Sequence, residues 1–141
     1  MGNRKTVMVL DAQGGGVGKQ LITLIRKEGL DARIIAVGTN SIATAAMLKA
    51  GADEAATGEN PVRVVSKMAD VIIGPVGMVI ADAMLGEITP LMASSVARAS
   101  AKRIMIPFGN CDNYIAGASD IGTGRLIADA VRQLKIYLGE A

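Results

Sequence analysis

Histidine is absent from this chain of 141 residues, and cysteine occurs only once, as Cys111. Without histidine, the chain cannot build a Ser-His-Asp or Cys-His catalytic arrangement, nor a metal site with imidazole ligands. A single cysteine forms no internal disulfide and cannot hold zinc or an iron-sulfur cluster on thiolates. These absences exclude the common nucleophilic hydrolases and thiolate metal sites, and the sequence predicts no metal site.

Aromatic residues and excess positive charge are also scarce. The chain has no tryptophan, two tyrosines and one phenylalanine, and its 15 basic and 13 acidic residues leave a net charge of +2. Proteins that bind nucleic acids use strongly basic surfaces, and those that bind single strands add aromatic side chains on which bases stack. We therefore expect no nucleic-acid partner.

Long apolar runs are missing as well. The longest uncharged apolar run, residues 71–81, is much shorter than the ~20 residues that cross a bilayer. The opening MGNRKTVMVLD has too few apolar residues before Asp11 for the core of a secretory signal. We therefore expect a cytoplasmic protein with no membrane partner, in which residues 1–141 form a single domain around one core.

Short apolar runs alternate with longer amphipathic segments, the pattern of a parallel sheet with helices on both faces. The runs typical of strands are residues 6–10, 32–37, 53–56, 70–74 and 102–108. The helical segments are residues 17–28, one that ends at Gly51, 61–68, a short piece up to Leu85, 90–100 and 122–138. We predict a single Rossmann-like three-layer α/β domain with a mainly parallel sheet of about five strands.

Polar residues indicate where three of these helices begin. Asn40 or Ser41 precedes the second helix, and Asn60 and Thr89 precede later ones, each followed by a proline. Side chains of these types accept a hydrogen bond from the first turn, and proline fits the first helical position. We predict that these residues are the N-caps.

The first predicted strand leads into a glycine-rich turn within Asp11 to Gln20, DAQGGGVGKQ. Glycine occupies four of the five positions from 14 to 18. Because glycine loses more backbone freedom on folding than other residues, this concentration needs a reason. A glycine turn before a helix N-terminus lets backbone N–H groups approach a phosphate. We predict an anion-binding turn, and a purely structural tight turn is the alternative.

The phosphate-loop pattern G-x-x-x-x-G-K-[ST] fits this turn incompletely. Gly18 and Lys19 match its GK pair, but Gln13 stands at its first glycine and Gln20 at the hydroxyl that binds magnesium. The variant K-G-G-V-G-K-[ST], found in ATPases of the partitioning and nitrogenase-iron-protein type, overlays better but also lacks its first lysine and its hydroxyl. A degenerate phosphate-loop protein is an open alternative.

The dinucleotide pattern G-x-G-x-x-G also fits only in part. Gly14 and Gly16 match, whereas Lys19 stands at the third glycine. After the second predicted strand, where an acid would bind a ribose diol, residues 39–41 are neutral. Such donors suit a 2′-phosphate or another polar group about as well as a ribose.

The predicted site lies at the carboxyl edge of the sheet, where open α/β sheets bind their ligands. The N–H groups of residues 15–19 would hold a phosphate-bearing small molecule. The sequence does not name the cofactor, and a nucleotide such as NADP or ATP is compatible with it. The predicted cofactor-binding residues are Gly14, Gly15, Gly16, Val17, Gly18, Lys19, Thr39, Asn40 and Ser41.

Candidate acids lie near the same edge, although none is predicted to be catalytic. Asp82 and Glu87 flank Gly86 among apolar residues, which can raise a carboxyl pKa enough for acid-base chemistry. A helix cap and an exposed charge are the simpler interpretation. Whether the protein is an enzyme is left open. The full set of candidate acids is Asp11, Glu59, Asp82, Glu87 and Asp112.

A non-catalytic ligand sensor or oligomeric assembly subunit is the competing class of function, with the glycine turn purely structural. Apolar side chains in the broken helical region would then form a homo-oligomer surface, although they suit a core equally well. These side chains are Met78, Val79, Met84, Leu85, Leu91 and Met92.

Four runs resemble a family of small bacterial proteins known as domain of unknown function 3842. The resemblance covers most of the chain, up to about Cys111, and the runs that carry it are QGGGVGKQ, GTNSIATAAMLKAGADEAATGEN, ADVIIGP and GEITPLMA. The resemblance implies a Rossmann-like α/β domain of bacterial origin. It implies no activity and assigns no catalytic residue.

Overall fold

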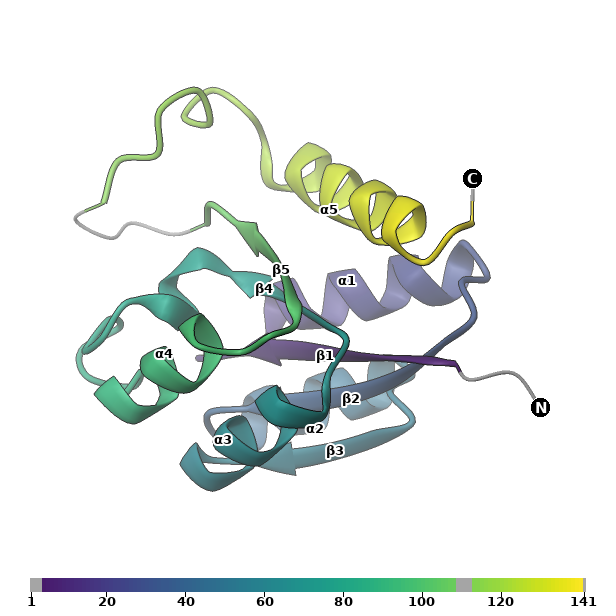
Figure 1. Cartoon of the computed structure of the whole chain (residues 1–141). Helices are drawn as coiled ribbons and strands as arrows, with labels where there is room; N and C mark the ends of the chain where they lie inside the picture. Colours follow the sequence, from purple (N-terminus) through teal and green to yellow (C-terminus); the bar gives the residue numbers. More distant parts are fainter. Residues whose placement is uncertain (1–3, 109–112, 141) are drawn as a thin grey trace.

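Five strands form one parallel sheet in the order β3-β2-β1-β4-β5 (Figure 1). The computed structural model describes residues 4–108 and 113–140. The strands are β1 (Lys5–Asp11), β2 (Ala32–Gly38), β3 (Glu54–Thr57), β4 (Val71–Pro75) and β5 (Lys102–Ile106). The helices are α1 (Gly16–Lys27), α2 (Ser41–Ala50), α3 (Glu59–Met68), the short 3-10 helix η1 (Val76–Val79), α4 (Pro90–Ala97) and α5 (Thr123–Tyr137). The predicted Rossmann-like fold with a parallel sheet is confirmed.

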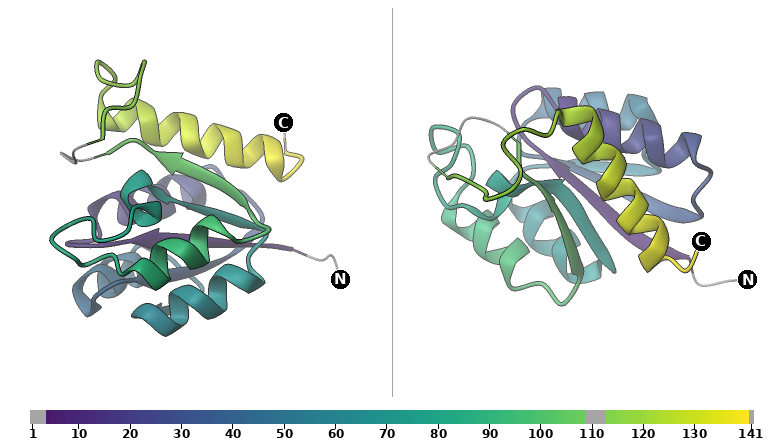
Figure 2. Two further views of the ribbon diagram at one scale, coloured as in Figure 1. Left: turned by 60° about the vertical axis from the view of Figure 1, so that its left-hand side comes forward. Right: turned by 90° about the horizontal axis from the view of Figure 1, so that it is seen from above.

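Helices cover both faces of the sheet (Figure 2). Val7 and Val9 of β1 belong to the core that contains α1 and α5. Met8 and Leu10 belong to the opposite core, with α3 and α4. All four side chains are fully buried, because successive residues of a strand point to opposite faces. Burial on both faces explains why this strand is continuously apolar instead of alternating.

Two of the predicted helix caps are confirmed, and one is wrong. The side chains of Asn40 and Thr89 accept hydrogen bonds from the first turns of α2 and α4. Asn60 does not cap α3, because the helix already begins at Glu59 with Gly58 as its N-cap. Gly58 has φ 109, a conformation that glycine adopts without a steric penalty, and it needs no side chain to turn the chain into the helix.

The predicted helical piece up to Leu85 is also wrong. The 3-10 helix η1 ends at Val79, and the chain then forms turns that we call the 80–88 loop. Asp82, Met84 and Leu85 have φ values of 66°, 58° and 58°. This left-handed backbone cannot continue a right-handed helix. Apolar content alone misled the prediction, because it does not reveal the sign of φ.

The central strand β1 has β2 on one side and β4 on the other. The chain leaves β1 toward the face of α1, and it leaves β4 toward the face of α4. Connections that leave neighbouring strands in opposite directions separate at the carboxyl edge, and open α/β sheets bind ligands at such a position. A ligand site is therefore expected at the edge between β1 and β4.

Candidate functional site

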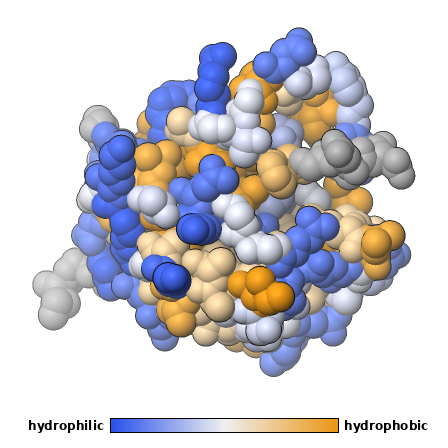
Figure 3. Space-filling view, turned by 180° about the vertical axis from the view of Figure 1, so that it is seen from behind, coloured by the Kyte–Doolittle hydropathy of each residue, from blue (hydrophilic) through white to orange (hydrophobic). Residues whose placement is uncertain are grey.

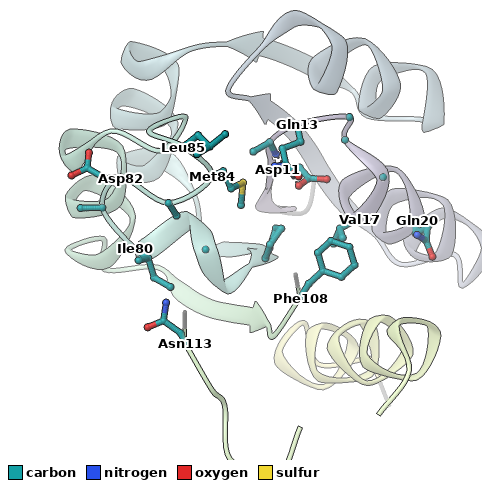
Figure 4. Close-up of a pocket in the computed structure, with 18 residues that line it drawn as sticks. Asp11, Gln13, Val17, Gln20, Ile80, Asp82, Met84, Leu85, Phe108 and Asn113 are labelled. Carbon is teal, nitrogen blue, oxygen red and sulfur yellow. Dashed lines mark hydrogen bonds between the residues drawn. The ribbon is translucent and has the colours of Figure 1, made fainter. Parts of the chain in front are cut away.

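A cavity of about 750 Å³ opens at the carboxyl edge between β1 and β4 (Figure 4). Figure 4 shows Met84 and Leu85 on one side of it and Val17 and Phe108 on the other. Its volume lies within the roughly 300–1,000 Å³ common for small-molecule sites. The wall consists of residues 11–17, Gln20, Pro75, Gly77, residues 80–85, Phe108 and Asn113.

Two of the four glycines in the turn are required by packing. Gly15 has φ +77°, and a Cβ atom there would lie 2.8 Å from the Cα atom of Ala43 in α2. A Cβ atom on Gly18 would overlap the side chain of Met47, also in α2. The close approach of α1 to α2 therefore depends on glycine at both positions. The purely structural interpretation explains this half of the turn.

Gly14 and Gly16 have no such packing requirement. Neither has a positive φ, and a Cβ atom on either would meet no heavy atom within 4 Å. Both line the cavity, so the absence of side chains keeps this space open. Within residues 4–108 and 113–140, no group accepts a hydrogen bond from their N–H groups. The fold alone does not explain these two glycines.

The inner side of the turn is held by the buried carboxylate of Asp11, the last residue of β1. Its Oδ1 accepts a hydrogen bond from Ala12 N at 2.8 Å, and its Oδ2 accepts one from Gly18 N at 2.7 Å. Burial raises the pKa of Asp11, backbone N–H donors counteract this, and the charge of Glu87 raises it further, so the net shift is upward. An internal anion thus already uses the N–H group of Gly18.

The carboxylate of Glu87, in the 80–88 loop, reaches the end of β2. Its Oε2 accepts hydrogen bonds from Gln13 N at 2.7 Å, from Asn40 Nδ2 at 2.8 Å and from the Thr39 hydroxyl. Burial raises the pKa of Glu87, but these hydrogen bonds outweigh it and hold the pKa below its usual value. Ser41, the third residue predicted to bind ligand here, is exposed at the start of α2.

This contact could not be found from the sequence. The dinucleotide pattern places its acid directly after β2, whereas the acid found there in the structure is 47 positions beyond Asn40. No feature of the sequence around Glu87 or around Asn40 indicates that the two residues are in contact. Only the path of the 80–88 loop over the sheet edge brings Glu87 to this position.

The 80–88 loop holds a strained backbone by its own hydrogen bonds and by one buried side chain. Asp82 N donates to Ile88 O at 2.7 Å, and Ile88 N donates to Ala83 O at 3.2 Å. The side chain of Ile88 is fully buried in the core on the α3 and α4 face of the sheet. Left-handed φ values at Met84 and Leu85 cost about 1–2 kcal/mol per residue. Such strain persists only where the surroundings stabilise it, and it is concentrated at functional sites.

Only part of the predicted glycine-turn set lines the cavity. Residues 14–17 are in the wall, whereas Gly18 and Lys19 are not. The Lys19 N–H group donates to Gly15 O at 2.9 Å as part of α1, and its side chain is exposed. Gln20 is in the wall instead. The positive charge expected at the ligand therefore lies outside the cavity.

The remaining candidate acids that the structure describes, Glu59 and Asp82, do not form a cluster. Asp82 is exposed in the cavity wall, whereas Glu59 is outside it and accepts a hydrogen bond from the Thr89 hydroxyl at 2.6 Å. Cys111 and Asp112 lie outside the described residues. In the part of the chain that is described, no group of three or more His, Cys, Asp or Glu side chains could hold a metal ion.

The six apolar side chains considered for an oligomer surface are divided between core and surface. Met78 and Met92 are buried, whereas Leu85 and Leu91 are exposed, so the six cannot act together as one surface. On the face turned away in Figure 1, hydrophobic residues lie among hydrophilic ones (Figure 3). No helix among the described residues has the length and hydrophobicity needed to cross a membrane.

Alanine substitutions should separate the two kinds of glycine in the turn. Gly15→Ala should lower the free energy of unfolding by about 2–4 kcal/mol, because it combines a left-handed φ with overlap against α2. Gly16→Ala, at the first position of α1, should leave the free energy of unfolding unchanged or raise it by up to about 1 kcal/mol. Urea unfolding followed by circular dichroism measures both. Equal losses in the two variants would contradict this division.

The lowered pKa of Glu87 predicts a pH-dependent contribution to stability. In the folded state the carboxyl stays ionised below its unfolded-state pKa of about 4.3, so unfolding takes up a proton and stability rises with pH. The stability advantage of the wild type over Glu87→Gln should be full at pH 6–7 and should decline as the pH falls below about 4. Urea unfolding of both proteins between pH 3 and 7 tests this. A difference that does not change with pH would contradict it.

Several solved structures are similar to this chain, and three of them, all of low sequence identity, are the following. The crystal structure of AibC is 21% identical with a TM-score of 0.47, over 95% of this chain and 42% of AibC. A dodecameric FMN-dependent UbiX-like decarboxylase from Escherichia coli O157:H7 is 10% identical with a TM-score of 0.41, over 94% of both chains. A putative epimerase from Bacteroides thetaiotaomicron is 14% identical with a TM-score of 0.43, over 95% of this chain and 64% of the epimerase.

The sequence identities and TM-scores of these three structures are too low to indicate what this chain binds. No curated protein matches the sequence. A family model described as Domain of unknown function (DUF3842) matches residues 6–139, which is nearly the whole chain. The chain therefore belongs to the DUF3842 family, as the four sequence runs predicted.

Proposed function

We propose that this protein binds a small phosphate-bearing molecule, such as a nucleotide, in the cavity between β1 and β4. The observation that carries the proposal is the pair Gly14 and Gly16. Both line the cavity, packing does not require glycine at either position, and their N–H groups have no acceptor in the described part of the chain. Backbone N–H groups beside a helix N-terminus are well suited to a phosphate.

This proposal shifts the phosphate from the centre of the predicted set, residues 15–19, toward its first residues. The N–H group of Gly18 donates to Asp11, and that of Lys19 donates within α1. The phosphate therefore interacts with the outer part of the turn, at Gly14 and Gly16. The exposed Lys19 contributes only a nearby positive charge, which salt screens.

Asp11 opposes an anion in this cavity, because its carboxylate lies under the turn. Burial raises the pKa of Asp11, so protonation, which would remove this charge, costs less free energy than it does for an exposed aspartate. A bound phosphate would shift the pKa of Asp11 further upward. Anion binding and protonation of Asp11 therefore favour each other in this proposal.

A degenerate phosphate loop is less well supported by the geometry. Gly15 N donates to Ala12 O at 3.0 Å and closes a tight turn, and Gly15 itself packs against α2. A phosphate loop needs a wider backbone arc, together with a lysine on the phosphates and a hydroxyl on magnesium. Here Gln20 lies in the wall and Lys19 lies outside it.

The proposal covers binding and names no reaction. Asp11 and Asp82 are the carboxylates in the wall formed by the described residues, and the chain has no histidine to act as a base. A ligand sensor and an enzyme would use the same cavity. An assay for binding therefore comes before any assay for turnover.

Calorimetric melts with AMP, ATP, FMN, NADP and inorganic phosphate test the proposal. A bound compound at about 100 times its dissociation constant should add about 2.7 kcal/mol to the free energy of unfolding and raise the melting temperature by several degrees. Gly16→Asp should abolish this shift, because it places a carboxylate beside the phosphate. Lys19→Ala should weaken binding modestly, and less so at high salt.

The matched control is Gly122→Asp, which introduces the same charge at the N-cap of α5, outside the cavity wall. A Cβ atom at Gly122 also meets no heavy atom within 4 Å. This variant should keep the ligand-induced shift. The proposal is wrong if no phosphate compound raises the melting temperature, or if Gly16→Asp and the wild type respond equally.

A further inference from the structure

Glu87 lies where a dinucleotide-binding sheet has its ribose-binding acid, but it enters from the opposite side of the turn. In such sheets the acid follows β2, and the pyrophosphate passes over the glycine turn to the far side of β1. Here the side chain comes from the β4 side, and its Oε2 is bonded to Gln13 N in the turn and to Asn40 Nδ2 after β2. Glu87 therefore lies across the route from β2 to β4.

A second contact closes the same route. Asn40 Nδ2 also donates to Gln13 O at 2.9 Å, so the N-cap of α2 is bonded directly to the glycine turn. The hydroxyl of Thr39 is bonded to Glu87. Two of the three neutral donors predicted to hold a cofactor at the end of β2, Thr39 and Asn40, are thus already bonded to an internal carboxylate.

The negative charge of Glu87 also opposes a pyrophosphate on the route from β2 to β4. A pyrophosphate that crosses the turn would bring a second phosphate beside the Glu87 carboxylate, and like charges at such distances repel. Glu87 cannot easily move aside, because the next residue, Ile88, is fully buried and is bonded through N–H and C=O to Ala83 and Asp82. Admission of a dinucleotide would require this loop to be rearranged.

The cavity wall does not include Glu87, Thr39 or Asn40. Beyond the turn, the wall offers the apolar surfaces of Pro75, Ile80, Met84 and Phe108. A phosphate at Gly14 and Gly16 leaves this part of a cavity of about 750 Å³ for the remainder of the ligand. Mostly apolar walls with a few polar groups suit a planar ring system.

We infer that the site takes a phosphate monoester with a single ring system, the size of a mononucleotide, and that Glu87 excludes dinucleotides. This inference rests on the proposed function and adds the ligand class and a specificity-determining residue. If Glu87 instead served as the ribose-binding acid, its presence would strengthen dinucleotide binding. The inference predicts the opposite, that Glu87 weakens it.

Titration calorimetry with two matched ligand pairs, FMN with FAD and AMP with NAD, tests the inference. The wild type should bind at least one monophosphate about tenfold or more tightly than its dinucleotide partner. Glu87→Ala should bring the two affinities to within about threefold, chiefly because dinucleotide binding improves. Glu87→Gln, which keeps the shape without the charge, should give an intermediate ratio.

The matched control is Glu59→Ala, because Glu59 is also bonded to a threonine hydroxyl, whereas Glu87 is bonded in addition to Gln13 N in the glycine turn. It should keep the wild-type ratio. The inference is overturned if the wild type binds FAD or NAD as tightly as FMN or AMP, or if Glu87→Ala weakens a dinucleotide. Circular dichroism melts of each variant establish that the protein is folded at the assay temperature.

The two proposals fail in different ways. If Gly16→Asp leaves monophosphate binding unchanged, the proposed site is wrong, whatever the ratio of affinities. If Gly16→Asp abolishes binding and the wild type does not discriminate between the two ligand sizes, the site is correct and the role of Glu87 is wrong. If none of the four compounds binds to the wild type or to Glu87→Ala, the inference about ligand size is wrong, whereas the proposed site is wrong only if ATP, NADP and inorganic phosphate also fail to raise the melting temperature.

Discussion

The buried carboxylate of Asp11 connects the elements that meet at the carboxyl edge. Its side chain accepts hydrogen bonds from Ala12 and Gly18, which joins the end of β1 to the start of α1. Its backbone oxygen accepts a hydrogen bond from Thr39 N at 3.1 Å, which adds the end of β2. One residue thus fixes the turn, the helix and the neighbouring strand. Because this carboxylate uses the inner N–H groups, a ligand is left with the outer ones.

Glu87 is the second carboxylate that bears on the same turn, and the two have different environments. The pKa of Asp11 is shifted upward, chiefly by burial, whereas hydrogen bonds from Gln13, Thr39 and Asn40 hold the pKa of Glu87 down. The negative charge of Glu87 contributes to the upward shift of Asp11. The two carboxyl groups that contact this turn therefore have pKa values shifted in opposite directions.

The sequence predicted the fold well, because the fold depends on local patterns. Doubly buried strands are continuously apolar, as β1 shows, and the caps at Asn40 and Thr89 depend on residues within one turn. Asn60 failed as a cap because the preceding Gly58 already turns the chain. The helical piece up to Leu85 failed because three non-glycine residues adopt left-handed φ values, which residue type does not reveal.

The site was predicted only in outline. The pattern located the glycine turn at the sheet edge, but it treated all four glycines alike. Gly15 differs from Gly16 because it has a left-handed φ and because α2 lies against it, and the second cause is a fact of tertiary packing. The acid at the end of β2 escaped prediction for the same reason, since Glu87 belongs to a loop two strands later in the chain. Residue types alone do not determine which backbone N–H groups remain for a ligand.

The central claim is that the N–H groups of Gly14 and Gly16 hold a phosphate, and amide NMR tests it most directly. Proton-nitrogen spectra of labelled protein, titrated with inorganic phosphate, AMP and FMN, report on each glycine separately. We expect the largest shift changes at Gly14 and Gly16, and small ones at Gly18, whose N–H group donates to Asp11. Changes that are absent from Gly14 and Gly16, or largest at Gly18, would contradict it.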